Sequence, residues 1–302
     1  MTDVFKTATI LDHGLSIGVA ITTDTCREAT RVHQLQATSA IALGRLLTCT
    51  AIAGLMQEKP GALSMQIISS GRFNQVYADV SPEGRLRGYV HATDLDLPLF
   101  STEDPKGRRS IAPGFGPGHL SVIRNADVHD FVQSNTELTQ REVDTDVAHY
   151  LQTSDQNATI LQADVLLDEN KQIFAAGGVI VQALPGGDLD ALKQWGERLQ
   201  GDALPALLQN HQHDPSALLQ TLCPDATQTG KDIPLSWQCR CSDERVLGAL
   251  NMMSPEDLAE MVNERKSVSL TCQFCNKIYT VSPEGLEKVF TDTIIQRGTQ
   301  HN

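Results

Sequence analysis

The sequence is short of positive charge: 24 Lys and Arg residues stand against 37 Asp and Glu residues, giving a net charge of −13. Proteins that bind nucleic acid or anionic membranes through surface charge need a basic face. The cysteine-rich end is no exception, since residues 237–302 carry seven Lys and Arg against nine Asp and Glu. We therefore expect neither nucleic acid nor membrane as a partner.

The sequence also lacks a long apolar run that is free of charge. The best candidate, residues 40–56, is short for a membrane span and contains Arg45, so we expect a buried helix there. Residues 1–10 show no basic segment followed by an apolar core, which argues against a secretory signal peptide. Cysteines without an export signal predict a reducing, cytoplasmic location, where paired cysteines indicate metal or redox chemistry.

Arrangements typical of catalysis are missing as well. We find no Ser/His/Asp set, carboxylate pair or nucleotide motif, and the histidines are scattered. The glycine-rich segment 113–118 lacks the Gly spacing and the Lys-Ser/Thr of a phosphate-binding loop, and Pro117 removes an N–H donor. We predict that the protein is not an enzyme.

What the sequence does have is seven cysteines, four of them in two tight pairs. Cys239 and Cys241 form a C-x-C, and Cys272 and Cys275 form a C-x-x-C after thirty intervening residues. Side chains i and i+2 of an extended segment point to one face, and a C-x-x-C turn directs both sulfurs inward. The four cysteines therefore predict one tetrahedral zinc site. We expect a structural rather than a catalytic site, because four sulfur ligands leave no coordination position open for a substrate or water. We expect Cys26 and Cys49 to be packing residues, whereas Cys223 has no partner at ligand spacing.

Hydrophobic patterning predicts an α+β fold in three parts. Residues 1–187 alternate between hairpins and a few helices, which indicates a domain with an antiparallel-rich sheet. Residues 188–236 form an amphipathic helical linker, and residues 237–302 form a small four-cysteine domain. Within the small domain we expect two short helices capped by Ser242 and by Ser254, a hairpin around the C-x-x-C, and a last helix from Ser282.

The linker carries a leucine-rich stripe, and its helix should be broken or kinked at Pro205. A stripe of this kind has no core of its own, so it must be buried against another part of the protein. We expect it to lie on the sheet of the first domain with the zinc module beside it. The stripe consists of Leu189, Leu192, Trp195, Leu199, Leu204 and Leu207.

The chain resembles the redox-regulated heat-shock chaperones of the thirty-three-kilodalton class. The most specific match is the C-x-C followed by Ser-Asp-Glu-Arg-Val, with the C-x-x-C followed by Asn-Lys-Ile-Tyr. The family's Ser-Glu-Gln is replaced here by Ser154-Asp155-Gln156. Supporting matches, in the family's order, lie at residues 43–47, 84–90, 116–120, 176–178 and 184–186.

This resemblance implies an ATP-independent holdase. The reduced protein would bind one zinc ion through the four cysteines and be inactive. Hypochlorous acid, or peroxide with heat, would release zinc and form the disulfides Cys239–Cys241 and Cys272–Cys275. The linker would then lose structure, and the protein, as a homodimer, would bind unfolded or partially folded clients. Its linker residues Leu189, Leu192, Trp195 and Leu199 would belong to the client-related surface.

Two other hypotheses stay open. The C-x-x-C of Cys272 and Cys275 is also found in thiol-disulfide oxidoreductases, although these place it at a helix N-terminus, where the thiolate is activated. A constitutive zinc-ribbon module for RNA or ribosomal partners is the third candidate, and the acidic balance disfavours it.

Overall fold

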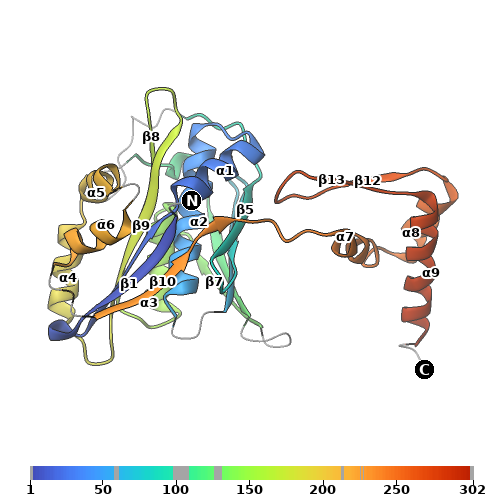
Figure 1. Cartoon of the computed structure of the whole chain (residues 1–302). Coiled ribbons are helices and arrows are strands. Elements are labelled where there is room, and N and C mark those ends of the chain that lie inside the picture. Colours follow the sequence, from blue (N-terminus) through green and yellow to red (C-terminus); the bar gives the residue numbers. More distant parts are fainter. Residues whose placement is uncertain are drawn as a thin grey trace. The chain divides into compact units, whose positions relative to one another are not determined.

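The computed structural model of the chain describes residues 3–57, 61–97, 109–125, 131–211, 214–224, 226 and 228–299 (Figure 1). The chain divides into two compact units, Met1–Gln238 and Cys239–Asn302.

The first unit is built on two sheets that are antiparallel throughout, apart from one short parallel strand. This confirms the predicted α+β fold with an antiparallel-rich sheet. One sheet has the order β10-β1-β2-β9-β8, with β1 (Val4–Ile10), β2 (Leu15–Ile21), β8 (Thr159–Leu167), β9 (Ile173–Ala183) and β10 (Gln228–Pro234). The other has the order β11-β5-β4-β3-β6-β7, with β3 (Ala62–Ser69), β4 (Gln75–Val80), β5 (Arg85–Val90), β6 (Gly118–Asn125), β7 (Phe131–Glu137) and β11 (Ser236–Trp237).

Helix α2 (Ala37–Leu55) is the centre of this unit. It contacts β3, β4 and β5 of one sheet and β2, β8 and β9 of the other, and all its residues are buried. Among the described residues it is the helix with the length and hydropathy of a membrane span, but its side chains are wholly inside the protein. The expectation of a buried helix is therefore confirmed. Helices α1 (Thr23–His33) and α3 (Val143–Thr153) pack beside α2.

Arg45 explains how a charged residue fits in the middle of this apolar helix. Its guanidinium donates to Glu142 at 2.9 Å and to Asp164 at 2.9 Å, and it also donates to the Arg109 carbonyl. The side chains of Arg45 and Glu142 are 0% and 1% exposed. Glu142 in turn accepts the backbone N–H of Ile111 at 2.9 Å. The cluster therefore ties α2 to segments far away in the sequence.

Replacing Arg45 should lower the unfolding free energy of the first unit. Arg45→Met leaves two buried carboxylates without their cation, and breaking a buried ion pair in this way costs about 3–5 kcal/mol of unfolding free energy. Arg31→Met is the matched control, since Arg31 pairs with Glu28 on the surface and is 72% exposed; a change within about 0.5 kcal/mol is expected. Both tryptophans, Trp195 and Trp237, lie in this unit, so their fluorescence during denaturation of the zinc-loaded protein reports on it. Equal stabilities of the two variants would contradict the structural role of the cluster.

The beginning of the chain differs from the sequence-based expectation. The loosely alternating apolar residues at 10–22 predict one strand, and the Thr/Asp-rich residues 22–25 predict a turn after it. In the structure β1 ends at Ile10, a short 3₁₀ turn (Leu11–His13) follows, and Gly14 at φ +57° leads into β2. The segment predicted as a turn begins α1, because the Asp3 carboxylate accepts the backbone N–H groups of Asp24 and Thr25. This cap comes from a residue that is distant in sequence.

The linker region contains strands as well as helices. Its helices are α4 (Leu189–Arg198), α5 (Ala203–His211) and α6 (Pro215–Leu222). The predicted break or kink at Pro205 is wrong in its position, because the helix is interrupted before Ala203, where Gly201 has a φ of +63°. Pro205 lies in the first turn of α5, where its missing N–H costs nothing. After α6 the chain adds β10 beside β1 and β11 beside β5.

The second unit is small and has a small core. It contains α7 (Asp243–Leu250), α8 (Pro255–Asn263), β12 (Val268–Thr271), β13 (Ile278–Val281) and α9 (Pro283–Thr299). The predicted caps are confirmed, since the Ser242 and Ser254 side chains accept the N–H groups of Arg245 and Asp257. The core that these elements enclose consists of Leu250, Leu258, Val281, Leu286 and Val289.

Candidate metal centre and linker surface

Four sulfurs from two separate segments meet in the second unit. Cys239 and Cys241 lie in the segment between β11 and α7, and Cys272 and Cys275 lie in the turn between β12 and β13. All four Sγ atoms are within 4.8 Å of one another. The Cys239–Cys272 sulfurs are 3.6 Å apart and the Cys241–Cys275 sulfurs are 3.5 Å apart. The structure therefore brings together the set that the spacing predicts.

The turn of the C-x-x-C is held by its own backbone. The Cys272 N–H donates to the Lys277 carbonyl at 3.0 Å, and the Asn276 N–H donates to the Cys272 carbonyl at 2.8 Å. Asn276 has a φ of +57°, a conformation that asparagine adopts more readily than most residues. Strands β12 and β13 pair in register from Val268–Val281 to Thr271–Ile278, which fixes the two ends of the turn.

The sulfurs of the cluster differ in pKa. Burial raises the pKa of Cys239 to about 12. For Cys241 burial also acts to raise the pKa, but hydrogen bonds from Tyr279 and from the neighbouring cysteines outweigh it and lower the pKa to about 7. Four thiolates this close together repel one another, so a full set of four needs a cation among them.

The donor set fits a zinc ion. A tetrahedron with metal–sulfur bonds of about 2.3 Å has sulfur–sulfur edges of about 3.8 Å, close to the separations of 3.5 and 3.6 Å seen here. Soft thiolates are ligands for zinc, copper(I) or iron–sulfur clusters rather than for magnesium or calcium. The four cysteines could therefore hold a metal ion, and zinc is compatible with them.

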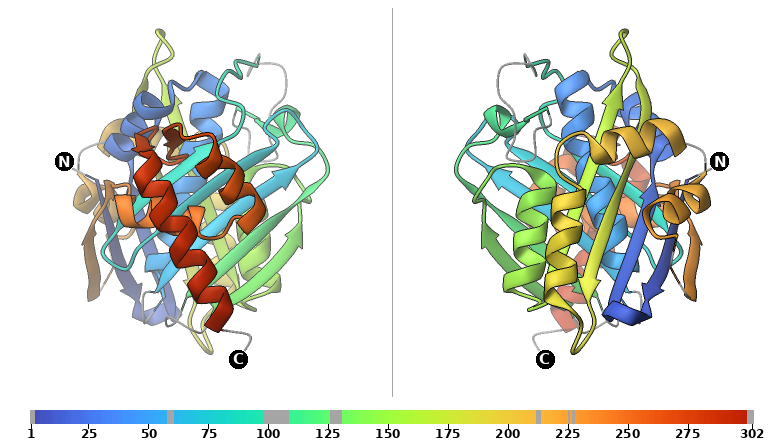
Figure 2. Two further views of the ribbon diagram at one scale, coloured as in Figure 1. Left: turned by 90° about the vertical axis from the view of Figure 1, so that its right-hand side faces the viewer. Right: turned by 90° about the vertical axis from the view of Figure 1, so that its left-hand side faces the viewer.

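The linker helices cover one face of the sheet that contains β1, β2 and β9. The right-hand view of Figure 2 shows α4 in yellow and α5 in gold, and these two helices contact β8 and β9, whereas α6 contacts β1 and β2. The predicted stripe is buried for the most part: Leu192 and Trp195 are each 6% exposed, and Leu199 is 1% exposed. They share one cluster with Ile17, Val19, Val179 and Val181 of the sheet. Leu189, by contrast, is 62% exposed, so its assignment to the buried stripe is wrong.

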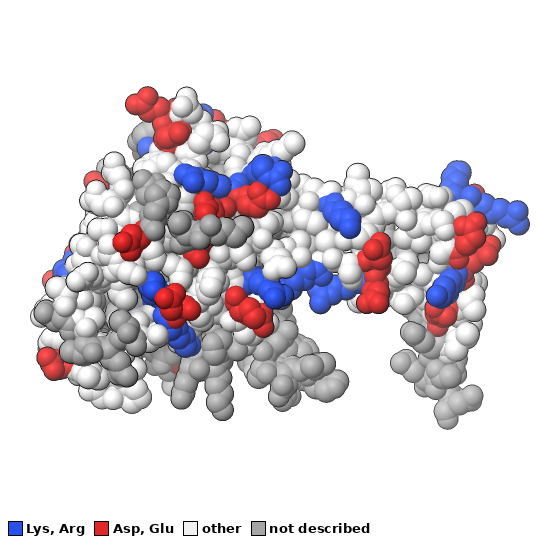
Figure 3. Space-filling view, in the orientation of Figure 1, with Lys and Arg blue, Asp and Glu red and all other residues white. Residues whose placement is uncertain are grey.

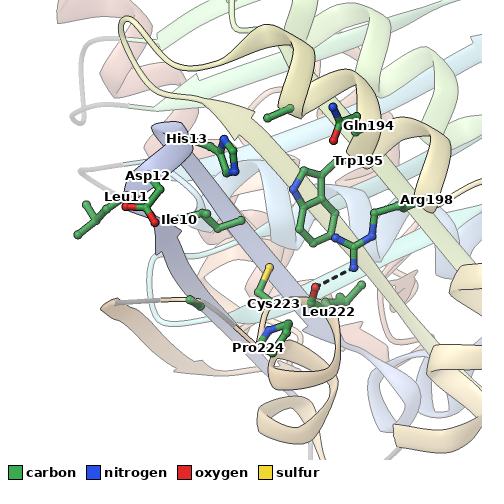
Figure 4. A pocket seen from close by; sticks show the side chains of 12 residues that line it. Ile10, Leu11, Asp12, His13, Gln194, Trp195, Arg198, Leu222, Cys223 and Pro224 are labelled. Atoms are coloured by element: carbon green, nitrogen blue, oxygen red, sulfur yellow. Dashed lines mark hydrogen bonds between the residues drawn. The ribbon is translucent and has the colours of Figure 1, made fainter.

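A second contact ties α4 to the end of α6. The Arg198 guanidinium lies 4.3 Å from the centre of the Trp195 ring and donates to the Leu222 carbonyl at 3.2 Å (Figure 4). Next to it is a cavity of about 260 Å³, bordered also by His13 and Cys223. Cys223, like Cys26 and Cys49, is buried. Apolar contacts thus dock the linker on the sheet, and the Arg198–Leu222 hydrogen bond joins two of the linker's own helices.

Comparison with known proteins identifies the family. The family model described as "Hsp33 protein" matches residues 3–282. The chain belongs to the Hsp33 family. A protein named "33 kDa chaperonin" from Streptococcus agalactiae serotype Ia is 31% identical over 273 residues, covering 90% of this chain and 92% of its own length. Its namesake from Streptococcus pyogenes serotype M6 is 32% identical over 272 residues, covering 89% and 92%.

A solved structure shows the same fold. The 33 kDa chaperonin (heat shock protein 33 homologue) from Thermotoga maritima superimposes with a TM-score of 0.81, at 23% identity, and covers 97% of this chain and 99% of that chain. The resemblance found in the sequence is confirmed, and the chain is a member of a heat-shock chaperone family.

Sequence reasoning did not identify Tyr279 as part of the site. Its hydroxyl lies 2.9 Å from Cys241 Sγ, so this residue belongs to the surroundings of the sulfurs. Its position in the sequence could have indicated this role, because the strand that follows a C-x-x-C turn lies beside the metal site that the turn forms.

Proposed function

We propose that this protein is a redox-switched, ATP-independent holdase for unfolded or partially folded proteins. The reduced form binds one zinc ion through Cys239, Cys241, Cys272 and Cys275 and is inactive, and oxidation of these cysteines activates it. Membership of a chaperone family supports the general function. The observation that carries the switch is the convergence of the four sulfurs within 4.8 Å in a unit with little else to stabilise it.

The same four residues stabilise the fold and sense the oxidant. Structural zinc contributes about 10–16 kcal/mol of apparent binding free energy in small modules, comparable to the net stability of about 5–15 kcal/mol of a whole domain. When bound, zinc holds the thiols as thiolates, the form that oxidants attack. A reaction at the sulfurs therefore removes the ligands on which the second unit depends.

The oxidation converts each cysteine pair to a disulfide. Two thiolates give up two electrons to one peroxide, which takes two protons and becomes two waters; hypochlorous acid acts in the same way and leaves chloride and water. We propose the links Cys239–Cys241 and Cys272–Cys275. Such disulfides close very short loops and constrain the unfolded chain little. They do not replace a connection across thirty residues.

The linker transmits the change to the first unit. Strand β11, just before Cys239, lies beside β5 through hydrogen bonds that include Ser236 N–H to the Gly84 carbonyl at 3.1 Å and Gln238 N–H to the Leu86 carbonyl at 2.8 Å. A two-residue strand is easily lost when the chain that follows it unfolds. Release of β11, then β10 and the helices, exposes apolar surface of the sheet, which is what an unfolded client binds. The exposed surface also accounts for a homodimer of the oxidised form.

The alternatives have less support. The C-x-x-C lies in a turn between two strands, whereas a thiol activated for disulfide exchange typically lies at a helix N-terminus. A zinc ribbon that binds nucleic acid needs positive surface charge, whereas this chain has a net charge of −13. On the face shown in Figure 3, Lys and Arg side chains lie among Asp and Glu side chains rather than in one basic patch.

An aggregation assay on a chemically unfolded client tests the proposal. The reduced, zinc-loaded protein should leave light scattering nearly unchanged, and the oxidised protein should suppress it at a few molecules per client, without ATP. Peptide mapping of the oxidised sample should find the two links within the pairs, with Cys26, Cys49 and Cys223 mostly free. Equal suppression by both forms would contradict the switch, and insulin reduction without client protection would favour the oxidoreductase.

A further inference from the structure

Tyr279 connects the two cysteine pairs through a direct contact. It lies on β13, the strand that follows the C-x-x-C turn, and its hydroxyl donates to the Sγ of Cys241 in the C-x-C at 2.9 Å. The residue is only 5% exposed. The Lys277 ammonium lies 4.5 Å from the centre of the tyrosine ring. The hairpin that presents one cysteine pair thus also holds a sulfur of the other pair.

Packing alone does not account for this hydroxyl. Along β13 the side chains alternate, with Tyr279 and Val281 buried and Ile278 and Thr280 exposed. A phenylalanine would fill the inward position equally well, and a buried tyrosine hydroxyl needs a hydrogen-bond partner. Here the partner is a sulfur, and the pairing of Tyr279 with Leu270 on β12 fixes the ring beside it. The hydroxyl therefore has a direct effect on the chemistry of Cys241.

We propose that Tyr279 is a positioning residue that retains Cys241 in the metal cluster and lowers the reactivity of its sulfur. The inference rests on the zinc site proposed above. A hydrogen bond to a thiolate withdraws electron density from the sulfur, which makes the thiolate a weaker nucleophile. It also fixes the ligand in place, and loss of an outer partner of a metal ligand typically costs 10–100-fold in metal affinity. Tyr279 thereby sets how much oxidant the protein tolerates before the switch operates.

Tyr279→Phe in the full-length, reduced, zinc-loaded protein tests this inference. The substitution keeps the ring and removes the hydroxyl. Transfer of zinc to a chromogenic chelator should become about 10-fold faster or more, in line with the loss of affinity expected for an outer-shell partner. Brief alkylation with iodoacetamide, followed by peptide mapping, should show a rise of several-fold in the labelling of Cys241 relative to Cys272. The matched control is Thr280→Val, which removes a hydroxyl from the exposed face of the same strand and should change neither quantity.

The ratio of labelling separates a specific effect from general loosening. If Tyr279→Phe raises labelling of all four cysteines equally, the residue is merely structural and the inference is overturned. Unchanged zinc transfer and labelling also overturn it. A parent protein that binds no zinc would instead refute the proposed function itself.

Replacement of tyrosine by a fluorinated analogue tests the inference independently, in case Tyr279→Phe does not fold. The protein has four tyrosines, and the other three, Tyr77, Tyr89 and Tyr150, lie in the first unit. Uniform replacement by 3-fluorotyrosine makes the hydroxyl a stronger donor while preserving the ring. Labelling of Cys241 relative to Cys272 should then fall at neutral pH. A ratio equal to that of the parent would contradict the role of the hydrogen bond.

Discussion

Removal of zinc from the reduced protein is expected to unfold residues 239–302 while α2 and the strands around it in the first unit stay folded. Hydrogen exchange measured by peptide should show the amides of β12, β13 and α9 exchanging at the rates of an unfolded chain. The amides of β2 and β9 should keep their protection. A chelator alone, without oxidant, should be enough to unfold the second unit, because the unfolding results from loss of the metal.

The expected effect is large because the second unit has few other sources of stability. Its buried core consists of Leu250, Leu258, Val281, Leu286 and Val289, and a chain of about sixty residues rarely gains more than about 3–5 kcal/mol from a single core. The zinc contribution of about 10–16 kcal/mol exceeds this. The first unit has its own extensive core around α2 and no part in the cluster.

Cysteine variants test the same expectation without a chelator. Cys272→Ser should lose zinc and unfold the second unit even under reducing conditions. Cys223→Ser is the matched control, since Cys223 lies outside the cluster; this variant should keep one zinc per chain. The account is wrong if metal analysis finds full zinc occupancy in Cys272→Ser, or if the second unit keeps its protection after zinc has gone.

Leu199→Glu is expected to give client protection in the reduced, zinc-loaded state. Leu199 is 1% exposed and lies at the end of α4, in the cluster shared by the linker and the sheet. Truncating a buried leucine costs about 2–5 kcal/mol, and a buried carboxylate without a partner adds to this cost. The helix should therefore leave the sheet, and the surface beneath it should become available to clients.

The same substitution at Leu189 is the matched control for Leu199→Glu. Leu189 belongs to the same helix but is 62% exposed. In the aggregation assay, reduced Leu189→Glu should therefore give the same light scattering as the reduced parent. Trp195 lies on α4 between the two positions, and its fluorescence should move to longer wavelength in Leu199→Glu alone. If Leu199→Glu folds, keeps zinc, releases α4 and still protects clients no better than the parent, the linker is not the element that transmits the switch.

The parts of the structure that follow from short stretches of sequence were predicted well. The two cysteine pairs, the caps at Ser242 and Ser254 and the buried helix around Arg45 depend on neighbours within a few residues. In each case spacing or composition carries the information directly. The convergence of the two pairs is a longer-range feature, but metal chemistry leaves few other arrangements for four thiols at these spacings.

The parts that were missed depend on distant residues. Helix α1 begins where Asp3 caps it, and β10 is a polar strand with a glycine and a terminal proline that forms because β1 is there to pair with it. The exposure of Leu189 has a similar origin: it is the first residue of α4, and the regular spacing of leucines does not tell where a helix meets its sheet. Local pattern identifies an apolar stripe, whereas tertiary packing decides which of its members are buried.

The most direct test of the switch follows zinc and client binding in one oxidation experiment. Hypochlorous acid is added to the reduced, zinc-loaded protein, and aliquots are assayed for released zinc, for disulfides within the two cysteine pairs and for suppression of client aggregation. We predict that all three rise together and that a thiol reductant with zinc restores the inactive form. Client protection that is complete before any zinc is released, or zinc release that leaves protection at the reduced level, would contradict the account.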